Sequence, residues 1–212
     1  MTSPSLDARD ARTAARAVAE RLASAGHEAL FCGGAVRDRL LSREAQDHDV
    51  ATSATPEQVA ALFPRAVRVG ARFGVIVLPL AHHQVEVATF RDDGLYVDGR
   101  HPTDVRFSTP ERDAQRRDFT VNGLFEVPAT GEVLDYVDGR RDLRARLIRA
   151  IGDPEARFGE DHLRMLRAVR LAAQLDFAIH GDTFDAIRRL APRVTDVSPE
   201  RVRTELLRLL VH

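Results

Sequence analysis

"FCGGAVRDRLLSREAQDHDVAT", residues 31–52, combines a glycine pair, a helical stretch and two aspartates that flank a histidine. The apolar residues before Gly33 predict a strand, "AVRDRLL" predicts a helix and "HDVAT" predicts a second strand. Successive side chains of a strand point to opposite faces, so Asp47 and Asp49 are expected on one face while His48 points away. The segment therefore predicts a strand, turn, helix and strand that present two carboxylates together.

Asp47 and Asp49 are suited to bind a divalent cation. Two carboxylates this close repel each other unless a cation lies between them. Mg²⁺ prefers hard oxygen ligands, and it usually takes one or two carboxylates together with water and substrate phosphates. Glu86 in "VEVAT" offers a third carboxylate on another predicted strand. Because three such groups form a two-metal phosphoryl-transfer site, we expect all three to be catalytic, with Asp47 and Asp49 as ligands of two Mg²⁺ ions.

Gly33 and Gly34 lie where the first strand turns into the helix. Lacking side chains, they let backbone amides approach a ligand closely. The following helix presents free N–H groups and a positive dipole end, both favourable to a triphosphate, and Arg37 can pair with phosphate oxygens. Each motif alone is also typical of ordinary turns and surface loops. Their occurrence together favours one nucleotide site, with phosphates at the glycines and metals at the aspartates.

Composition limits the class of protein. The chain has 212 residues, 44% of them hydrophobic and 30% charged, which is typical of a soluble globular protein with one domain or one domain and a smaller appendage. No apolar run approaches the ~20 residues of a membrane span, and the N-terminus lacks the apolar stretch of a signal peptide. We therefore expect a cytoplasmic protein with no membrane partner. Cys32, the single cysteine, is expected to pack as a small hydrophobe.

All 31 basic residues are arginine. This composition excludes Schiff-base lysine chemistry and the lysine-dependent P-loop. Arginine suits forked recognition of phosphates and bases. The net charge of -1 gives no global nucleic-acid signal, so any such contact must come from local clusters.

The predicted elements divide into a mixed part and a helical part. Helices are expected over residues 7–25 and 55–63, with Thr55 as N-cap, and strands over 73–80 and 84–91. His82 and His83 lie in the turn between those strands, where an exposed role is favoured over a metal site. A polar, irregular stretch covers 92–115. After it, helices are expected over 140–151, 154–177, 181–194 and 198–212.

Five ordered motifs carry a family resemblance. "GGAVRDRLL...DHDVAT", "VEVATFR", "RRDFTVNGL", "EDHLRMLRAVR" and "ERVRTEL" resemble the class II tRNA nucleotidyltransferases and bacterial poly(A) polymerases, from about residue 30 to 210. The resemblance implies an α+β fold, with a polymerase-β-like head over residues 1–145, a small mixed sheet flanked by helices, and an all-helical neck over 146–212. Family members generally continue into body and tail domains that this sequence does not include, so we expect either the head and neck of a longer protein, which we favour, or a minimal form that finds its RNA otherwise.

The resemblance also implies an activity. The family is known for CCA-adding enzymes, which build the 3′ end of tRNA from CTP and ATP, and for relatives that add A tails to RNA. We expect CMP and AMP addition to an RNA primer, most simply a tRNA 3′ end, with A-tailing as the alternative. Enzymes that add only CC lack a flexible loop that residues 92–107 here supply, so A addition is expected. A catalytically silent binding module ranks below both, because all three carboxylates are present. Oligomeric state is not predicted.

Carried over by the resemblance, further residues bind the nucleotide. Gly34 and Arg37 contact the triphosphate, and the phosphate- and ribose-binding residues of "RRDFTVN" are Arg117, Asp118 and Asn122. The base-reading residues are Asp161 and Arg164, and Arg167 and Arg170 extend the contact along the same helix. Glu200 and Arg201 are expected to be structural. His162 stands where the family commonly has proline, and His48 replaces a usually apolar residue.

Asp161 and Arg164 can select a base without a template. C and A offer an amino donor beside a ring-nitrogen acceptor, whereas U and G offer a carbonyl acceptor beside an N–H donor. A carboxylate accepts and a guanidinium donates, so the pair fits C and A. A wrong base leaves polar groups unpaired, at roughly 1–3 kcal/mol for each lost contact. For Arg167 and Arg170, a solvated and salt-bridged helix face is an equally good interpretation.

Overall fold

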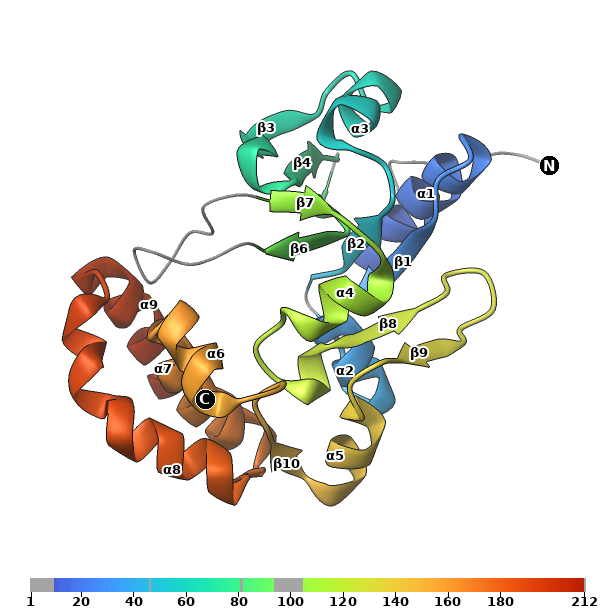
Figure 1. Cartoon of the computed structure of the whole chain (residues 1–212). Helices are drawn as coiled ribbons and strands as arrows, with labels where there is room; N and C mark the ends of the chain where they lie inside the picture. Colours follow the sequence, from blue (N-terminus) through green and yellow to red (C-terminus); the bar gives the residue numbers. More distant parts are fainter. Residues whose placement is uncertain (1–9, 46, 81, 94–104, 212) are drawn as a thin grey trace.

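A seven-stranded mixed sheet forms the centre of the computed structural model, which describes residues 10–45, 47–80, 82–93 and 105–211 (Figure 1). Its strand order is β3-β4-β5-β2-β1-β8-β9. The β2 and β5 strands run parallel, and the other neighbours run antiparallel. In chain order the strands are β1 (Ala29–Cys32), β2 (Asp49–Thr52), β3 (Val67–Gly70), β4 (Val75–Pro79), β5 (Gln84–Thr89), β8 (Leu124–Glu126) and β9 (Val133–Asp135).

Helices cover the sheet, and α2 and α3 begin where the sequence signals predict. They are α1 (Ala11–Ser24), α2 (Gly34–Leu40), α3 (Pro56–Leu62), α4 (Pro110–Gln115) and α5 (Gly139–Ala145), with short 3-10 turns η1 (Ala71–Phe73) and η2 (Thr120–Asn122). The Thr55 hydroxyl accepts from the Gln58 amide, and the Gln58 side chain bonds back to the Thr55 N–H. This reciprocal capping box satisfies two otherwise unpaired amides of α3.

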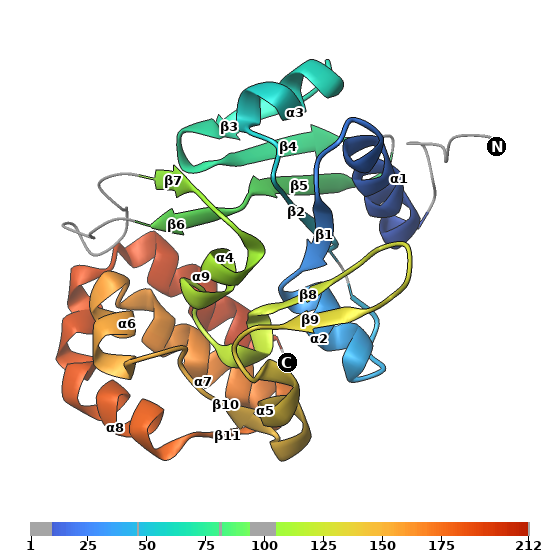
Figure 2. The same cartoon turned by 45° about the vertical axis from the view of Figure 1, so that its right-hand side comes forward.

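The C-terminal part is helical, as predicted. It contains α6 (Pro154–Glu160), α7 (Leu163–Leu175), α8 (Gly181–Leu190), η3 (Ala191–Asp196) and α9 (Pro199–Leu210). Figures 1 and 2 show these helices gathered at one side of the sheet. The predicted helix over 140–151 is wrong beyond residue 145, because β10 (Leu147–Ile148) there pairs in parallel with β11 (Ala178–Ile179).

The stretch 92–115, predicted to be irregular, contains regular structure at both ends. The β6 strand (Arg91–Asp93) pairs with β7 (Val105–Phe107), and α4 follows. Thr109 caps α4, since its side chain accepts from the Arg112 amide. The middle of the loop, residues 94–104, to which we assigned A addition, lies outside the described residues.

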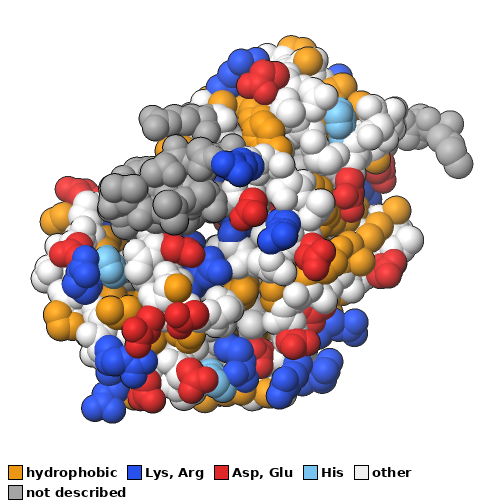
Figure 3. All heavy atoms as spheres, viewed as in Figure 1, with side chains coloured by type: hydrophobic (Ala, Val, Ile, Leu, Met, Phe, Trp, Pro, Cys, Tyr) orange, Lys and Arg blue, Asp and Glu red, His pale blue; other side chains and the backbone are white. Residues whose placement is uncertain are grey.

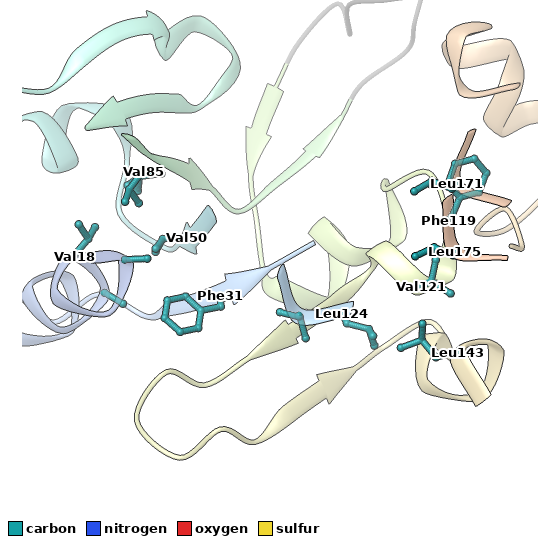
Figure 4. Close-up of a cluster of buried hydrophobic side chains, with 14 of the residues drawn as sticks. Val18, Phe31, Val50, Val85, Phe119, Val121, Leu124, Leu143, Leu171 and Leu175 are labelled. Atoms are coloured by element: carbon teal, nitrogen blue, oxygen red, sulfur yellow. The ribbon is translucent and has the colours of Figure 1, made fainter. Parts of the chain in front are cut away.

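One continuous hydrophobic cluster joins the sheet to the C-terminal helices. Figure 4 shows Val18, Phe31 and Val50 at one end of it, and Leu171 and Leu175 of α7 at the other. All five side chains are buried. The predicted boundary between residues 145 and 146 therefore separates two parts of the chain that share buried contacts.

The surface carries charges of both signs, interspersed over the face shown in Figure 3. This distribution agrees with the net charge of -1. Among the described residues, no helix combines the length and the apolar character that a membrane crossing requires.

Gly139 is required by close packing at the start of α5. A Cβ atom at this position would lie 2.9 Å from Leu124 Cδ2 and well inside contact distance of the Thr120 carbonyl oxygen. Gly139→Ala should therefore lower the free energy of unfolding by about 1–3 kcal/mol, the usual cost of overpacking.

Gly159→Ala is the matched control, because nothing lies within 4 Å of the added methyl group. In helix α6 this change should raise stability by up to ~1 kcal/mol. Urea unfolding of both variants measures the difference, and an equal response would contradict the packing argument.

Candidate active site

A cavity of about 520 Å³ lies between the sheet and helices α7 and α9. Every site residue predicted from the sequence except Asp47 lines it. The cavity wall also contains six residues to which the sequence analysis gave no binding role: Cys32, Ala88, Arg116, Leu163, Leu171 and Arg201. Seven arginines and four carboxylates face it, so positive charge exceeds negative charge by three. Such an excess suits a polyanionic ligand.

The floor of the cavity is a row of side chains across three adjacent strands. Cys32 pairs with Asp49 between β1 and β2, and the parallel register of β2 with β5 places Glu86 beside Asp49. Burial, followed by the charge of Glu86, raises the pKa of Asp49 to about 6. Burial also raises the pKa of Cys32 to about 11, which keeps the thiol protonated and agrees with a packing role. The two carboxylates thus share a site where their negative charges are poorly compensated.

The predicted position of Asp47 needs correction. The β2 strand begins at Asp49, so Asp47 precedes it, is exposed and does not line the cavity. The alternation of strand side chains therefore does not apply to Asp47, although its charge contributes to the raised pKa of Asp49. His48 is buried and packs edge-on against Phe31, away from the cavity, as predicted. Within the described residues, no group of three or more His, Cys, Asp or Glu side chains is arranged to hold a metal ion.

The glycine turn and Arg37 lie together on the cavity wall. Gly33 has a φ of 69°, which favours glycine, and a Cβ atom there would lie 3.3 Å from Arg117 Nη1. Arg37 Nη1 donates to Asn122 Oδ1 at 2.6 Å, and Arg37 Nε donates to Asp38 at 2.8 Å. Two predicted nucleotide-binding side chains, Arg37 and Asn122, are therefore in direct contact although 85 residues separate them in sequence.

Asp113 orients two arginines of the cavity, and sequence reasoning missed it. Its buried carboxylate accepts from Arg116 (2.6 Å) and from Arg117 (2.8 Å). Burial alone would raise the pKa of Asp113, but the Arg117 and Arg116 charges lower it overall. Phe125 lies under the Arg117 guanidinium, 4.8 Å from ring centroid to Cζ. The sequence signal that could have identified Asp113 is the spacing D-x-x-R-R after the helix N-cap at Thr109. Side chains three and four residues apart lie next to each other on a helix, so Asp113 can reach both arginines.

Asp118 connects the head to α7. Its carboxylate accepts from Arg167 Nη2 (2.7 Å), from Asn122 Nδ2 (3.1 Å) and from the Phe119 amide (2.8 Å). Although burial alone would raise it, the Arg167 charge lowers the pKa of Asp118 to about 2. The predicted ribose-binding and neck residues are therefore linked by one ionised carboxylate.

The base-reading residues do not lie on one helix, because the helix predicted over residues 154–177 is interrupted between α6 and α7. Asp161 has extended backbone (φ −154°, ψ 105°) between α6 and α7, and its Oδ1 accepts from the Leu163 amide at 3.1 Å. The side chain thus satisfies the first amide of α7, although His162 is the N-cap residue. Arg164 pairs with Glu160 and donates to the Arg157 carbonyl at 2.9 Å. Asp161 and Arg164 nevertheless line the same cavity.

Arg170 is held by an acidic residue of α9. Arg170 Nε donates to Glu205 at 2.5 Å, and the Glu205 side chain is only 4% exposed. Arg201 of α9 pairs with Asp161 at 2.7 Å. His82 and His83, by contrast, do not line the cavity, and His82 is exposed as expected.

The fold and the cavity have known relatives. A family model described as the poly A polymerase head domain matches residues 29–149, and one described as a probable RNA and SrmB-binding site of polymerase A matches residues 176–212. The CCA-adding enzyme of Enterococcus faecalis is 44% identical over 187 residues, which cover 88% of this chain and 46% of that protein. The chain thus spans about half the length of the curated relatives it matches.

Two solved structures share this architecture. The crystal structure of the Bacillus stearothermophilus CCA-adding enzyme in complex with CTP has a TM-score of 0.84 and 40% identity, covering 99% of this chain and 49% of that one. The Thermotoga maritima CCA-adding enzyme complexed with tRNA has a TM-score of 0.77 and 25% identity, covering 92% and 46%. The resemblance inferred from the five motifs is confirmed. Because the head-domain model matches more than half of the residues, the chain belongs to the poly(A) polymerase head-domain family.

Proposed function

We propose that the chain is the head and neck of a nucleotidyltransferase that adds CMP and AMP, from CTP and ATP, to the 3′ end of tRNA. The observation that carries this proposal is the cavity that Asp49 and Glu86 line together with the glycine turn and with arginines of α2 and α7. Relatives described as CCA-adding enzymes, at 44–46% identity, support the choice of reaction. The same proposal includes the division of the chain into head and neck between residues 145 and 146. It also includes a cytoplasmic location.

Asp49 and Glu86 lie side by side and suit a divalent cation, and in this proposal the exposed Asp47 would have to turn toward them to add a further ligand. The raised pKa of Asp49, caused by burial and then by Glu86, identifies negative charge that the protein leaves poorly compensated. Carboxylate oxygens are the ligands that Mg²⁺ prefers. When bound, two Mg²⁺ ions supply activation of the attacking hydroxyl and neutralisation of phosphate charge. The oxygens for such ions would come from Asp47, Asp49 and Glu86.

The protein's own residues bind and orient the nucleotide in this proposal. Arg37 and Arg117 pair with phosphate oxygens beside Gly33 and Gly34, and Asp118 and Asn122 contact the ribose. In-line attack of the RNA 3′-hydroxyl on the α-phosphorus forms the new P–O bond and releases pyrophosphate. Arginine forks suit this role, because they neutralise phosphate charge bidentately.

Base choice is assigned to Asp161 and Arg164 of the cavity wall. Asp161 accepts from the amino group of C or A and Arg164 donates to the ring nitrogen, while U and G leave these polar groups unpaired. Arg167 and Arg170 extend the contact. In the described structure both arginines have acidic partners, Asp118 and Glu205, so the alternative of a salt-bridged helix face is also supported for them.

Poly(A) tailing is the second candidate, because the matching family model is that of the poly A polymerase head domain. Incubating the chain with a tRNA that lacks its 3′ CCA, followed by sequencing of the products, separates the two. Addition of C, C and A is expected. A long A run would instead favour a poly(A) polymerase, and nucleotide binding without extension of the RNA would favour a silent binding module.

A further inference from the structure

Arg201 makes a forked contact with the carboxylate of Asp161. Arg201 Nη2 lies 2.7 Å from Oδ2, and Nη1 lies 3.2 Å from Oδ1. The two side chains are 25% and 16% exposed, and both line the cavity. Bidentate pairs of this kind fix the plane of a carboxylate as well as its charge. Arg201 is therefore placed to control the group that reads the base, although the sequence analysis expected a structural role for it.

Asp161 is held from two directions. Its Oδ1 accepts from the Leu163 amide at the start of α7, and Arg201 of α9 approaches both oxygens. Asp161 itself lies between two helices in extended backbone. Without Arg201, only the capping bond would restrain the side chain. The geometry of the carboxylate thus depends on α9.

The fixed orientation of the Asp161 carboxylate matters for selection. An ionised carboxylate only accepts hydrogen bonds, and each oxygen keeps a lone pair for an amino group of C or A. The carbonyl group of U or G is itself an acceptor, so it cannot pair with these oxygens. The fork of Arg201 fixes the plane in which the accepting oxygens of Asp161 lie.

The helix α9 is positioned by a second pair on the same face. Arg201 and Glu205 are four residues apart, which places them together on a helix. Glu205 is buried and accepts from Arg170 of α7 at 2.5 Å. Arg201 therefore points into the cavity from a helix that is anchored along α7.

We propose that Arg201 determines base specificity by positioning Asp161. The proposal rests on the proposed function, because it takes Asp161 to read the base. Arg201 is a positioning residue and does not itself need to contact the nucleotide. Its loss should change the preference between bases rather than nucleotide affinity in general.

The test is equilibrium binding of CTP, ATP, UTP and GTP, each with Mg²⁺, by calorimetry. Arg201→Ala should reduce the preference for CTP over UTP, and for ATP over GTP, by about tenfold, the value of one charge-assisted hydrogen bond. Arg201→Lys keeps the charge without the fork and should lose part of the preference. Arg203→Ala is the matched control, because this exposed arginine of the same helix lies outside the cavity. It should keep the wild-type preference.

A double-mutant cycle separates an effect of Arg201 that acts through Asp161 from a general effect on the packing of α9. In an Asp161→Ala background, Arg201→Ala should cause no further change in preference, because the positioned group is already absent. Equal weakening of all four nucleotides by Arg201→Ala, or a wild-type chain without base preference, would overturn the proposal. If Arg201→Ala does not fold, an unchanged preference in Arg201→Lys overturns it. Selective binding without extension of RNA would refute the proposed function and leave this inference standing.

Discussion

Asp49→Asn should reduce nucleotide addition by at least about a thousandfold, because it removes a proposed metal ligand that supplies several kcal/mol of stabilisation in the transition state. Asparagine keeps the size of the side chain and its contacts with β1. It removes the negative charge that a divalent cation requires. Asp49 is the carboxylate of β2 that lines the cavity, so the effect should exceed that of changes at the exposed Asp47.

The same change should leave the fold as stable as before or more stable. Burial and the charge of Glu86 raise the pKa of Asp49 to about 6, so its ionised form is disfavoured in the folded protein. Removing that charge relieves repulsion in the absence of metal. Activity and stability are thus expected to change in opposite directions, which a general folding defect would not produce.

Incorporation of labelled CMP into a tRNA lacking its 3′ end, alongside thermal melting, measures both quantities. Asp185→Asn is the matched control, since it makes the same chemical change at an exposed position of α8 outside the cavity. It should retain wild-type activity. Appreciable activity of Asp49→Asn across a range of Mg²⁺ concentrations would contradict the metal-ligand proposal.

Local sequence signals predicted the elements that build the cavity floor. The glycine turn, the helix after it and the strands that carry Asp49 and Glu86 each depend on neighbouring residues, through turn chemistry or alternation of side chains. These signals act within one turn or one strand. They therefore give both the type of element and the face that each side chain occupies.

The parts that could not be predicted depend on residues far apart in the chain. The sequence around Asp161 favours a helix on both sides, and the break coincides with a cap on α7 and a pair with Arg201, 40 residues further on. The β10 and β11 strands have two residues each, which is too short for any periodicity, and they form only by pairing with each other. Asp47 lies outside β2, because this strand begins at Asp49, one residue after the start at His48 that its sequence pattern predicts.

Asp118 should contribute more to stability than its place in a nucleotide site suggests. It is 8% exposed, and it accepts from Arg167 of α7 at 2.9 and 2.7 Å and from Asn122 of η2 at 3.1 Å. Removing one partner of a fully buried pair costs about 3–5 kcal/mol. The Arg167 side chain is 34% exposed, so solvent reduces that value, and we expect about 2 kcal/mol for Asp118→Asn. In a chain of this length, the melting temperature should fall by roughly 5 °C.

The dependence on pH distinguishes this ion pair from general packing. Burial opposes ionisation of Asp118, but the Arg167 charge and hydrogen bonds lower its pKa from 3.8 to about 2. A depressed folded-state pKa stabilises the fold above the unfolded value, and this contribution is lost as the pH falls toward 2. The difference in melting temperature between wild type and Asp118→Asn should therefore be full at pH 6 and should shrink between about pH 4 and pH 2. Asp176→Asn is the control, because Asp176 and its partner Arg146 are 91% and 60% exposed and should contribute under ~1 kcal/mol. A difference for Asp118→Asn that does not change with pH would assign its effect to shape alone.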